Sequence, residues 1–510
     1  MSLRPSRGDR PPASNVSIST TRAGFWLLSG KFLARSLDLV SLLVLARLLS
    51  PEDFGLVAIA TTVLVIVETV FDLPLVQALV RQGDLSDSML TTAFTLGLMR
   101  GLTICLIMVL AAWPLAWIYG DPRLTALLAA LALAPAMRSV VSPRLVLFMQ
   151  RFDFRPEFAL DLIQKGATLA VAIVAAILTG SYWSLAIGSV VGPTAAAAAS
   201  YVIAPMRPAF GLSEWARFKD MIGWHTVAQV LSAFTWQIDR LLLPRFTSLS
   251  VFGNFTVADN LASIPHQTFV GPLIRPLMAA FSKFEPGTPP LAAAFLKATH
   301  ALVLVGAPIL IVLAFLAEPV IAVVAGSGWD AAALILQWLC FASLIGLPAI
   351  AMPPLAMVLD RTQYATLRMA LEFAARVPLT VAGLMLFGLM GALFARVASA
   401  VVAYLASAFL SRRLIGVSLA LQFRTLLLSL LPALPMIAFL AFAQSELAGD
   451  IVDLRLILTL GTSVALALGI FWVSALALWT LRGRPAGLES TIVQMAADLL
   501  EGWRQIPRKP

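Results

Sequence analysis

Charged residues are scarce in this chain of 510 residues. Lys, Arg, Asp and Glu together make up 12% of it, whereas hydrophobic residues make up 60%. A soluble globular domain carries roughly 25% charged residues, and a fold of this size could not hide so much apolar surface from water. The composition therefore excludes a soluble enzyme and a disordered protein. It predicts an all-α polytopic membrane protein.

Cysteine and histidine are also rare, with two and three copies. Cys105 and Cys340 each lie inside an apolar run, without the spacing of a metal site or a disulfide framework. We therefore expect no metal and no cofactor. The net charge of +9 is typical of cytoplasmic membrane loops, so no nucleic-acid partner is expected. The motif GxxxxGK[ST] is absent as well, which argues against direct use of ATP.

About fourteen apolar runs are long enough to cross a bilayer, since a crossing helix needs about 20 such residues. They cover residues 24–48, 56–80, 90–118, 123–148, 158–179, 182–203, 219–243, 251–280, 294–324, 331–358, 364–387, 390–412, 424–444 and 455–481. Lys and Arg gather in alternate loops, whereas the opposite loops hold only Arg123, Arg245 and Arg455. Because cytoplasmic loops collect these residues, both termini are predicted to be cytoplasmic.

Two segments lie outside these runs at the ends of the chain. Residues 1–23 are polar and are predicted to form a cytoplasmic tail without a cleaved signal. Residues 487–506 place apolar side chains at helical spacing and predict an amphipathic C-terminal helix. This helix lies either on the cytoplasmic leaflet or against the cytoplasmic face of the protein itself.

An internal repeat divides the chain. The segment Arg47-Leu-Leu-Ser-Pro-Glu-Asp-Phe-Gly is matched 198 residues later by Arg245-Phe-Thr-Ser-Leu-Ser-Val-Phe-Gly, and Pro74-Leu75 by Pro272-Leu273. The offset corresponds to six spans, and an even number of spans returns the chain to the same orientation in the membrane. The repeat therefore predicts two parallel six-helix lobes with a substrate site between them. The predicted parts are an N-lobe (24–203), a cytoplasmic linker (204–218), a C-lobe (219–412) and two extra helices (424–481).

Several charged side chains fall inside the apolar runs, where an unpaired charge costs roughly 2.5–3.5 kcal/mol. Lys31, Arg35 and Asp38 share one face of the first run at i, i+4 and i+7. Together with Lys165 and Arg275 they predict a net cationic cavity. Such a cavity suits an anionic head group, because Arg and Lys donate several hydrogen bonds to phosphate oxygens.

Other charged residues inside the apolar runs have two possible roles. Asp161/Lys165 and Glu372/Arg376 either line the cavity or only neutralise each other at i, i+4 spacing. A second set, Arg100, Arg138 and Arg396, either lines the cavity or binds backbone carbonyls and the membrane interface.

Three stretches resemble a known family. They are LARLLSPEDFGLVAIATTVLVIVETVFDLPLVQALVR from Leu45, MQRFDFRPEFALDLIQKGATLAVAIVAAILTGSYWSLAIG from Met149, and WQIDRLLLPRFTSLSVFGNFTVADNLASIP from Trp236. In order and spacing they resemble bacterial oligosaccharide flippases of the multidrug/oligosaccharidyl-lipid/polysaccharide exporter superfamily. The resemblance covers roughly residues 20–415.

The resemblance implies a flippase rather than an enzyme. Its cargo would be an undecaprenyl-pyrophosphate-linked oligosaccharide, moved across the bacterial inner membrane by alternating access for surface or exopolysaccharide biosynthesis. Membrane lipids are the other expected partners, the protein is expected to be a monomer, and association with polysaccharide polymerase machinery is open. Na⁺ or H⁺ is the candidate coupling ion, with Asp38, Asp239 and Asp259 as the acids that would carry the coupling.

Three other functions stay open. The same superfamily contains lipid II flippases, which suit fourteen spans, and multidrug or cation exporters, which favour acidic cavities. A polytopic glycosyltransferase is the third, because Glu52-Asp53 in the first loop resembles an acidic catalytic motif. Against it, the short loops leave no room for the long periplasmic loop of such enzymes.

Overall fold

The computed structural model describes residues 30, 33–73, 75–81, 85–151, 153–216, 218, 233–234, 236–447, 453–485, 487–490 and 493–494. The described part of the chain is nearly all helical and contains no strand. It divides into two compact units, residues 1–237 and residues 238–510. The predicted all-helical fold class is thus confirmed, whereas the predicted lobe boundaries stay a prediction.

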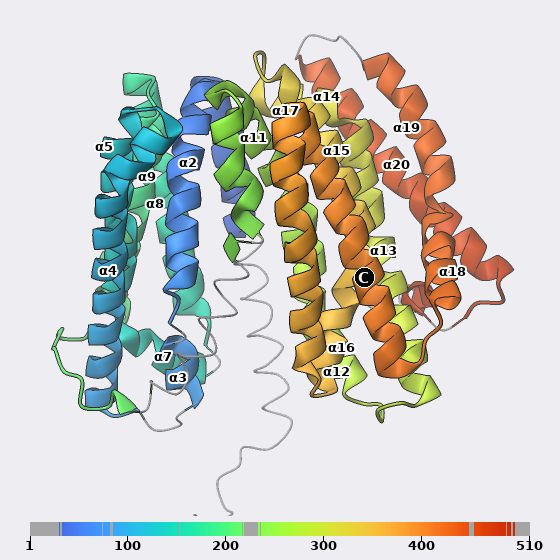
Figure 1. Cartoon of the computed structure of the whole chain (residues 1–510), viewed down its shortest axis with the longest axis horizontal. Coiled ribbons are helices and arrows are strands. Elements are labelled where there is room, and N and C mark those ends of the chain that lie inside the picture. The colour runs from blue at the N-terminus through green and yellow to red at the C-terminus, as the bar shows by residue number, and fades with distance from the viewer. Residues whose placement is uncertain are drawn as a thin grey trace, which may run out of the picture. The chain divides into compact units, whose positions relative to one another are not determined.

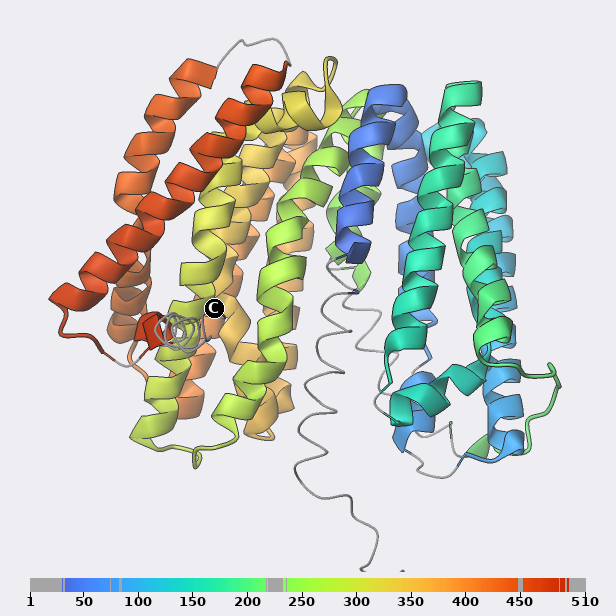
Figure 2. The ribbon, with the colours of Figure 1, turned by 180° about the vertical axis from the view of Figure 1, so that it is seen from behind.

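The first unit begins with helical residues 33–48. Its further helices, shown in Figures 1 and 2, are α2 (Pro51–Val70), α3 (Leu75–Arg81), α4 (Asp87–Tyr119), α5 (Arg123–Leu131), α6 (Leu133–Ser139), the 3₁₀ turn η1 (Pro143–Leu145), α7 (Val146–Gln150), α8 (Arg155–Thr179) and α9 (Trp183–Ile203).

The second unit contains helical residues 238–246 and the remaining elements of the chain. These are α11 (Leu249–Pro265), the π turn η2 (His266–Val270), η3 (Gly271–Leu273), α12 (Ile274–Phe281), α13 (Pro289–Phe315), α14 (Ala317–Ala325), α15 (Asp330–Gly346), η4 (Leu347–Ala351), α16 (Met352–Val358), α17 (Thr362–Ile415), α18 (Leu419–Leu430), α19 (Ala433–Leu447) and α20 (Leu454–Leu481).

Within the described residues, eight helices are long and apolar enough to cross a membrane. The number rises to ten if two sharply bent pairs, 123–150 and 419–447, each count as one crossing. The predicted runs 24–48 and 219–243 lie partly outside the described residues. A polytopic membrane protein is therefore confirmed, and the total of fourteen spans stays a prediction.

The sequence repeat has a structural counterpart. Ser50 caps α2 and Ser248 caps α11, and each hydroxyl accepts a hydrogen bond from the backbone N–H three residues later. Both serines have extended backbone angles, and the phenylalanine four residues on, Phe54 or Phe252, is buried. A serine in this position satisfies N–H groups that a helix start otherwise leaves unpaired. The repeat therefore encodes the same helix start in each unit.

The repeat also encodes a broken helix. The α-helix stops between α2 and α3, and 198 residues later it gives way to the π turn η2 and the 3₁₀ turn η3 between α11 and α12. A second break separates α6 from α7 at η1, where the axis bends by 51°, whereas α15 and α16 are joined through the 3₁₀ turn η4 and together form one candidate span. In each unit the two short helices that follow the breaks pack together, α3 with α7 and α12 with α16.

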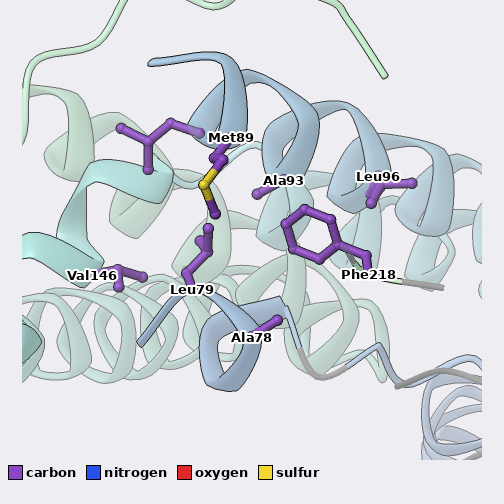
Figure 3. Packing of buried hydrophobic residues seen from close by; sticks show 8 residues of the cluster. Ala78, Leu79, Met89, Ala93, Leu96, Val146 and Phe218 are labelled. Carbon is purple, nitrogen blue, oxygen red and sulfur yellow. The ribbon is translucent and has the colours of Figure 1, made fainter. Parts of the chain in front are cut away.

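The short helix α3 is held by a cluster of buried apolar side chains, drawn in Figure 3. Leu79 of α3 packs with Met89 and Ala93 of α4, with Val146 of α7, and with Phe218 of the segment after α9. Because a helix of seven residues is not stable alone, this packing fixes its position.

Small residues bring two pairs of helices close together. In α9, Gly188 and Gly192 face α8, where a Cβ on Gly192 would lie 1.9 Å from Thr168 Oγ1.

Within α17, Gly388 has a φ of +57° and turns the chain, so that α17 consists of two helices. A Cβ on Gly391 would lie only 1.9 Å from the carbonyl oxygen of Gly383. Close backbone approach of this kind is common where helices pack in membranes.

Replacing Gly391 with alanine is expected to destabilise the protein by at least about 1–3 kcal/mol, because the added methyl group meets backbone rather than a movable side chain. Thermal unfolding in detergent, followed by tryptophan fluorescence, measures the change. Gly469→Ala is the matched control, since no atom lies within 4 Å of its added Cβ. That variant should be unchanged or gain about 0.5–1 kcal/mol. Equal stability of the two variants would contradict the assigned close contact.

The start of the predicted amphipathic helix is linked to helices α13 and α18 of the second unit. Glu489 is 6% exposed, and His300 Nε2 of α13 lies 2.9 Å from its Oε1. The other ring nitrogen of His300 lies 2.6 Å from Ser429 Oγ of α18. Burial raises the pKa of the Glu489 carboxyl, but the hydrogen bond and charge of His300 hold it below its ordinary value. The predicted helix 487–506 otherwise lies mostly outside the described residues.

His300→Ala is expected to release this segment, because it removes the hydrogen bond to a charged partner, a contact that contributes about 1.5–3 kcal/mol. Limited trypsin digestion should then cut after Arg482 several-fold faster than in the unaltered protein, whereas Pro485 blocks cleavage after Arg484. Glu446→Gln, which changes an exposed acid of α19, serves as the control. Cleavage at the unaltered rate in His300→Ala would show that the contact does not hold the segment.

Candidate functional site

Three of the predicted site residues lie together in the first unit. Asp38 Oδ1 accepts a hydrogen bond of 2.5 Å from Lys165 Nζ of α8, and Asp38 Oδ2 lies 3.5 Å from Arg35 NH1. The helix 33–48 places Arg35 and Asp38 on one face, one turn apart. We name Arg35, Asp38 and Lys165 the cationic cluster. Lys31, predicted with them, lies outside the described residues.

The cationic cluster stays accessible. The side chains of Arg35, Asp38 and Lys165 are between 36% and 48% exposed, and the cluster carries one more positive than negative charge. Lys165 Nζ bonds Asp38, so Lys165 does more than neutralise Asp161 one turn away on α8. Two flexible cations held at one carboxylate can re-form their bonds on an incoming anion.

Arg275, the fifth predicted binding residue, lies in the other unit. It is at the start of α12, just after the break at η3, and its side chain is exposed. It forms no ion pair with any described residue. The structure therefore unites Arg35, Asp38 and Lys165, and Arg275 stays a separate prediction.

The two acids predicted for ion coupling in the second unit are held by arginines. Asp239 is 2% exposed and bonds Arg376 NH2 at 2.6 Å, Arg396, and the hydroxyl of Thr380 at 3.3 Å. Asp259 of α11 accepts bonds from Arg240 at 2.6 and 3.0 Å.

Arg396 also reaches Asp259 at 3.4 Å, so the two acids belong to one network. Their oxygens are occupied by guanidinium groups, and a coupling cation would first have to displace an arginine. Within the described residues no group of His, Cys, Asp and Glu could hold a metal ion. The coupling role of Asp38, Asp239 and Asp259 stays a prediction.

The sequence reasoning missed that these arginines act together. Arg376 and Arg396 come from the two helices of α17, on either side of the Gly388 turn, and meet at Asp239, 137 and 157 residues away in sequence. The predicted alternative of a Glu372–Arg376 pair is the weaker contact at 4.0 Å, whereas Glu372 bonds Arg368 at 3.0 Å. The only local signal was the presence of charges within apolar runs.

Two further arginines of the first unit are predicted either to line the cavity or to bind backbone carbonyls. Arg100 binds backbone carbonyls, and Arg138 does not. Arg100 donates to the carbonyl oxygens of Phe71 and Glu68, where α2 ends, and lies 3.4 Å from Asp72. Arg138 instead forms two bonds to the Glu68 carboxylate, at 2.6 and 2.8 Å. Arg100 therefore stabilises the break after α2, whose carbonyl groups have no helical partners, and Arg138 links α6 to the end of α2.

A cavity of about 580 Å³ lies next to these breaks, entirely within the first unit. Its walls are α3, α4, α7 and the first turns of α8, together with the breaks at Asp72–Leu73 and Val141–Pro143. Leu79, Ala93 and Val146 of the cluster in Figure 3 form part of the lining. The sequence did not predict this cavity, because it depends on where two separate helices break.

The acidic pair Glu52-Asp53 has structural roles. Asp53 completes the capping box with Ser50, and Glu52 lies 2.8 Å from Arg123, which also binds Asp121 at 2.7 Å. Burial raises the pKa of the Asp121 carboxyl, but hydrogen bonds and the charge of Arg123 hold it below its ordinary value. These contacts account for the acids that had suggested a glycosyltransferase.

Residues 44–334 match the polysaccharide biosynthesis protein family. This match covers more than half of the chain and includes parts of both units. The chain belongs to that family. The predicted relationship to polysaccharide-exporting membrane proteins is thereby confirmed at the level of the family.

Two curated relatives are similar to this family member. The succinoglycan biosynthesis transport protein ExoT of Rhizobium meliloti (strain 1021) is 27% identical over 326 residues, which are 62% of this chain and 65% of ExoT. The lipopolysaccharide biosynthesis protein WzxC of Escherichia coli (strain K12) is 24% identical over 329 residues, 63% of this chain and 66% of WzxC. The alignments thus span less than two thirds of either relative.

A solved structure supports the fold. The lipid II flippase MurJ in its inward closed conformation matches with a TM-score of 0.67 and 14% identity, over 89% of this chain and 99% of MurJ. At this identity the likeness establishes that this polysaccharide biosynthesis protein has the same fold, and nothing about its cargo.

The buried network of the second unit yields a test of stability. Asp239→Ala should destabilise this polysaccharide biosynthesis protein by about 3–5 kcal/mol, because it leaves two guanidinium groups without their shared carboxylate. Unfolding in detergent measures the loss. Asp239→Ala combined with Arg376→Met should recover part of it. Asp87→Ala, at the exposed pair with Arg144, should cost less than about 1 kcal/mol. A loss no larger for Asp239→Ala than for Asp87→Ala would refute the network.

Proposed function

We propose that this protein is a flippase for an undecaprenyl-pyrophosphate-linked oligosaccharide, used in surface or exopolysaccharide biosynthesis. The observation that carries the proposal is the accessible cationic cluster Arg35–Asp38–Lys165 within a chain of this family. A pyrophosphate is the anionic group that such a pair of cations suits best.

The names of the relatives agree with this cargo. ExoT is named a transport protein of succinoglycan biosynthesis, and WzxC a protein of lipopolysaccharide biosynthesis. Both polymers are built from saccharides. Because ExoT is named a transport protein, transport rather than catalysis is the activity that we assign, and the protein is proposed not to be an enzyme.

Asp38 gives the cationic cluster two states. Without cargo its carboxylate holds Lys165 and Arg35 side by side, at 2.5 and 3.5 Å, and offsets part of their charge. With cargo the pyrophosphate oxygens replace Asp38 as acceptors. Because a ligand shifts a conformational equilibrium only by its difference in affinity for the two states, this exchange of partners can couple binding to rearrangement. The lobes would then alternate in opening to each side of the membrane.

The location follows from the loop charges. We place the protein in the bacterial inner membrane with both termini in the cytoplasm, since Lys and Arg gather in the loops on that side. The polyprenyl tail stays among the membrane lipids while the head group passes the cationic cluster. Arg275 is a second candidate contact for the pyrophosphate. Na⁺ or H⁺ is retained as the coupling ion, and the protein is proposed to act as a monomer alongside polymerase machinery.

Lipid II transport is a second candidate function. It is supported only by the likeness of the fold to that of the lipid II flippase MurJ. Both cargoes carry a polyprenyl pyrophosphate, so the cationic cluster fits either. The sugar and peptide parts differ, and transport assays with each cargo separate the two.

Arg35→Ala and Lys165→Ala should each lower the rate of flipping at least about tenfold, because each removes a charge-assisted contact that contributes about 1.5–3 kcal/mol. The measurement is the movement of a labelled polyprenyl-pyrophosphate oligosaccharide across reconstituted vesicles. Arg144→Ala, an exposed arginine paired with Asp87, is the control for loss of a positive charge. Normal flipping by both cluster variants, at normal protein abundance, would overturn the assignment.

A further inference from the structure

The cavity of the first unit lies at the end of the helices that the loop charges predict to be cytoplasmic. It is bounded by α3, α7 and the start of α8, which adjoin the loops flanked by Arg81 at the end of α3, Arg151 after α7 and Arg155 at the start of α8. These loops are predicted to be cytoplasmic. Its volume of about 580 Å³ is within the range of sites for small organic ligands.

The lining of the cavity carries more negative than positive charge. Asp72, Asp153, Glu157 and Asp161 supply four carboxylates, against the guanidinium groups of Arg100 and Arg138. The two arginines bind carboxylates themselves, Arg138 that of Glu68 and Arg100 that of Asp72. The cavity therefore differs in sign from the cationic cluster on the same helix α8.

The spacing along α8 explains this contrast. Asp153 lies two residues before α8 begins, and Glu157, Asp161 and Lys165 follow at intervals of four residues as one stripe along the helix. The first three line the cavity, and Lys165 bonds Asp38 in the cationic cluster. One helix face thus offers a cationic position and, beside it, an acidic chamber.

The rest of the lining suits a sugar. Phe148 supplies an aromatic side chain, and Gln164 an amide that both donates and accepts. The faces of a sugar ring are apolar C–H surfaces, and its hydroxyl groups donate hydrogen bonds to carboxylates. An acidic substituent would meet like charges, which cost several kcal/mol where water is partly excluded.

We propose that this cavity receives the first sugars of the cargo and selects neutral sugars against acidic ones such as hexuronic acids. The inference rests on the proposed function, because it takes the pyrophosphate of the same cargo to lie at the cationic cluster. The acidic lining rejects the wrong head group by repulsion, as specific sites commonly do.

The test uses the full-length protein in lipid nanodiscs and two synthetic probes. One is farnesyl pyrophosphate linked to a disaccharide of two neutral hexoses, and the other carries a hexuronic acid in place of one hexose. The neutral probe should bind at least about tenfold more tightly at low salt, with a smaller difference at high salt. Farnesyl pyrophosphate without sugar measures the contribution of the pyrophosphate alone.

The double variant Glu157→Gln and Asp161→Asn removes two lining charges while keeping side-chain shape. It should bring the two affinities to within about threefold of each other, mainly by improving the binding of the acidic probe. Glu318→Gln, an exposed acid at the start of α14 in the other unit, is the matched control and should keep the full preference. A thermal unfolding curve for each variant confirms that it is folded.

The outcomes separate this inference from the proposed function. Equal binding of both sugar probes by the unaltered protein, or an unchanged preference in the double variant, overturns the acidic cavity as selector and leaves the flippase standing. Binding of none of the three probes overturns both. An organic cation such as tetraphenylphosphonium is the last probe. If it binds in the cavity, loses its binding in the double variant and is unaffected by the neutral probe, the cavity is a site for cations and the inference is overturned.

Discussion

The cost of placing a charge among apolar helices governs this structure. A carboxylate or guanidinium group removed from water needs a partner of opposite charge and further hydrogen bonds. Asp239 meets this requirement with two arginines and a threonine, and Arg138 meets it with Glu68. Each such contact joins helices that are distant in sequence. The charges that first marked the chain as unusual therefore also join the helices within each unit.

The same requirement applies to the backbone at helix breaks. Where α2 ends, Arg100 binds the exposed carbonyl oxygens of Phe71 and Glu68. Breaks in membrane helices persist only where protein or water satisfies the freed groups, so they coincide with cavities and binding sites. In the first unit two breaks meet at a cavity, and the charged residues that stabilise them also line it. Stability and recognition thus depend on the same side chains.

Charge of opposite sign is divided along α8. Lys165 joins Arg35 and Asp38, whereas Glu157 and Asp161 face the cavity. A cargo with an anionic linkage and uncharged sugars would match both parts at once. The second unit uses its charges differently, since Asp239 and Asp259 are occupied by arginines. The two units share a repeat in sequence and in helix breaks, yet their polar interiors have diverged.

The sequence by itself determined the membrane class, the family, the repeat and the common face of Arg35 and Asp38, because composition, order and helical spacing are local properties. It also marked Asp239, Arg376 and Arg396 as charges in apolar runs. Only the tertiary structure decided that these three meet, that Lys165 bonds Asp38 at 2.5 Å, and that two breaks enclose a cavity. Partners more than a hundred residues apart are brought together by helix packing, and no spacing in the sequence encodes which helices become neighbours.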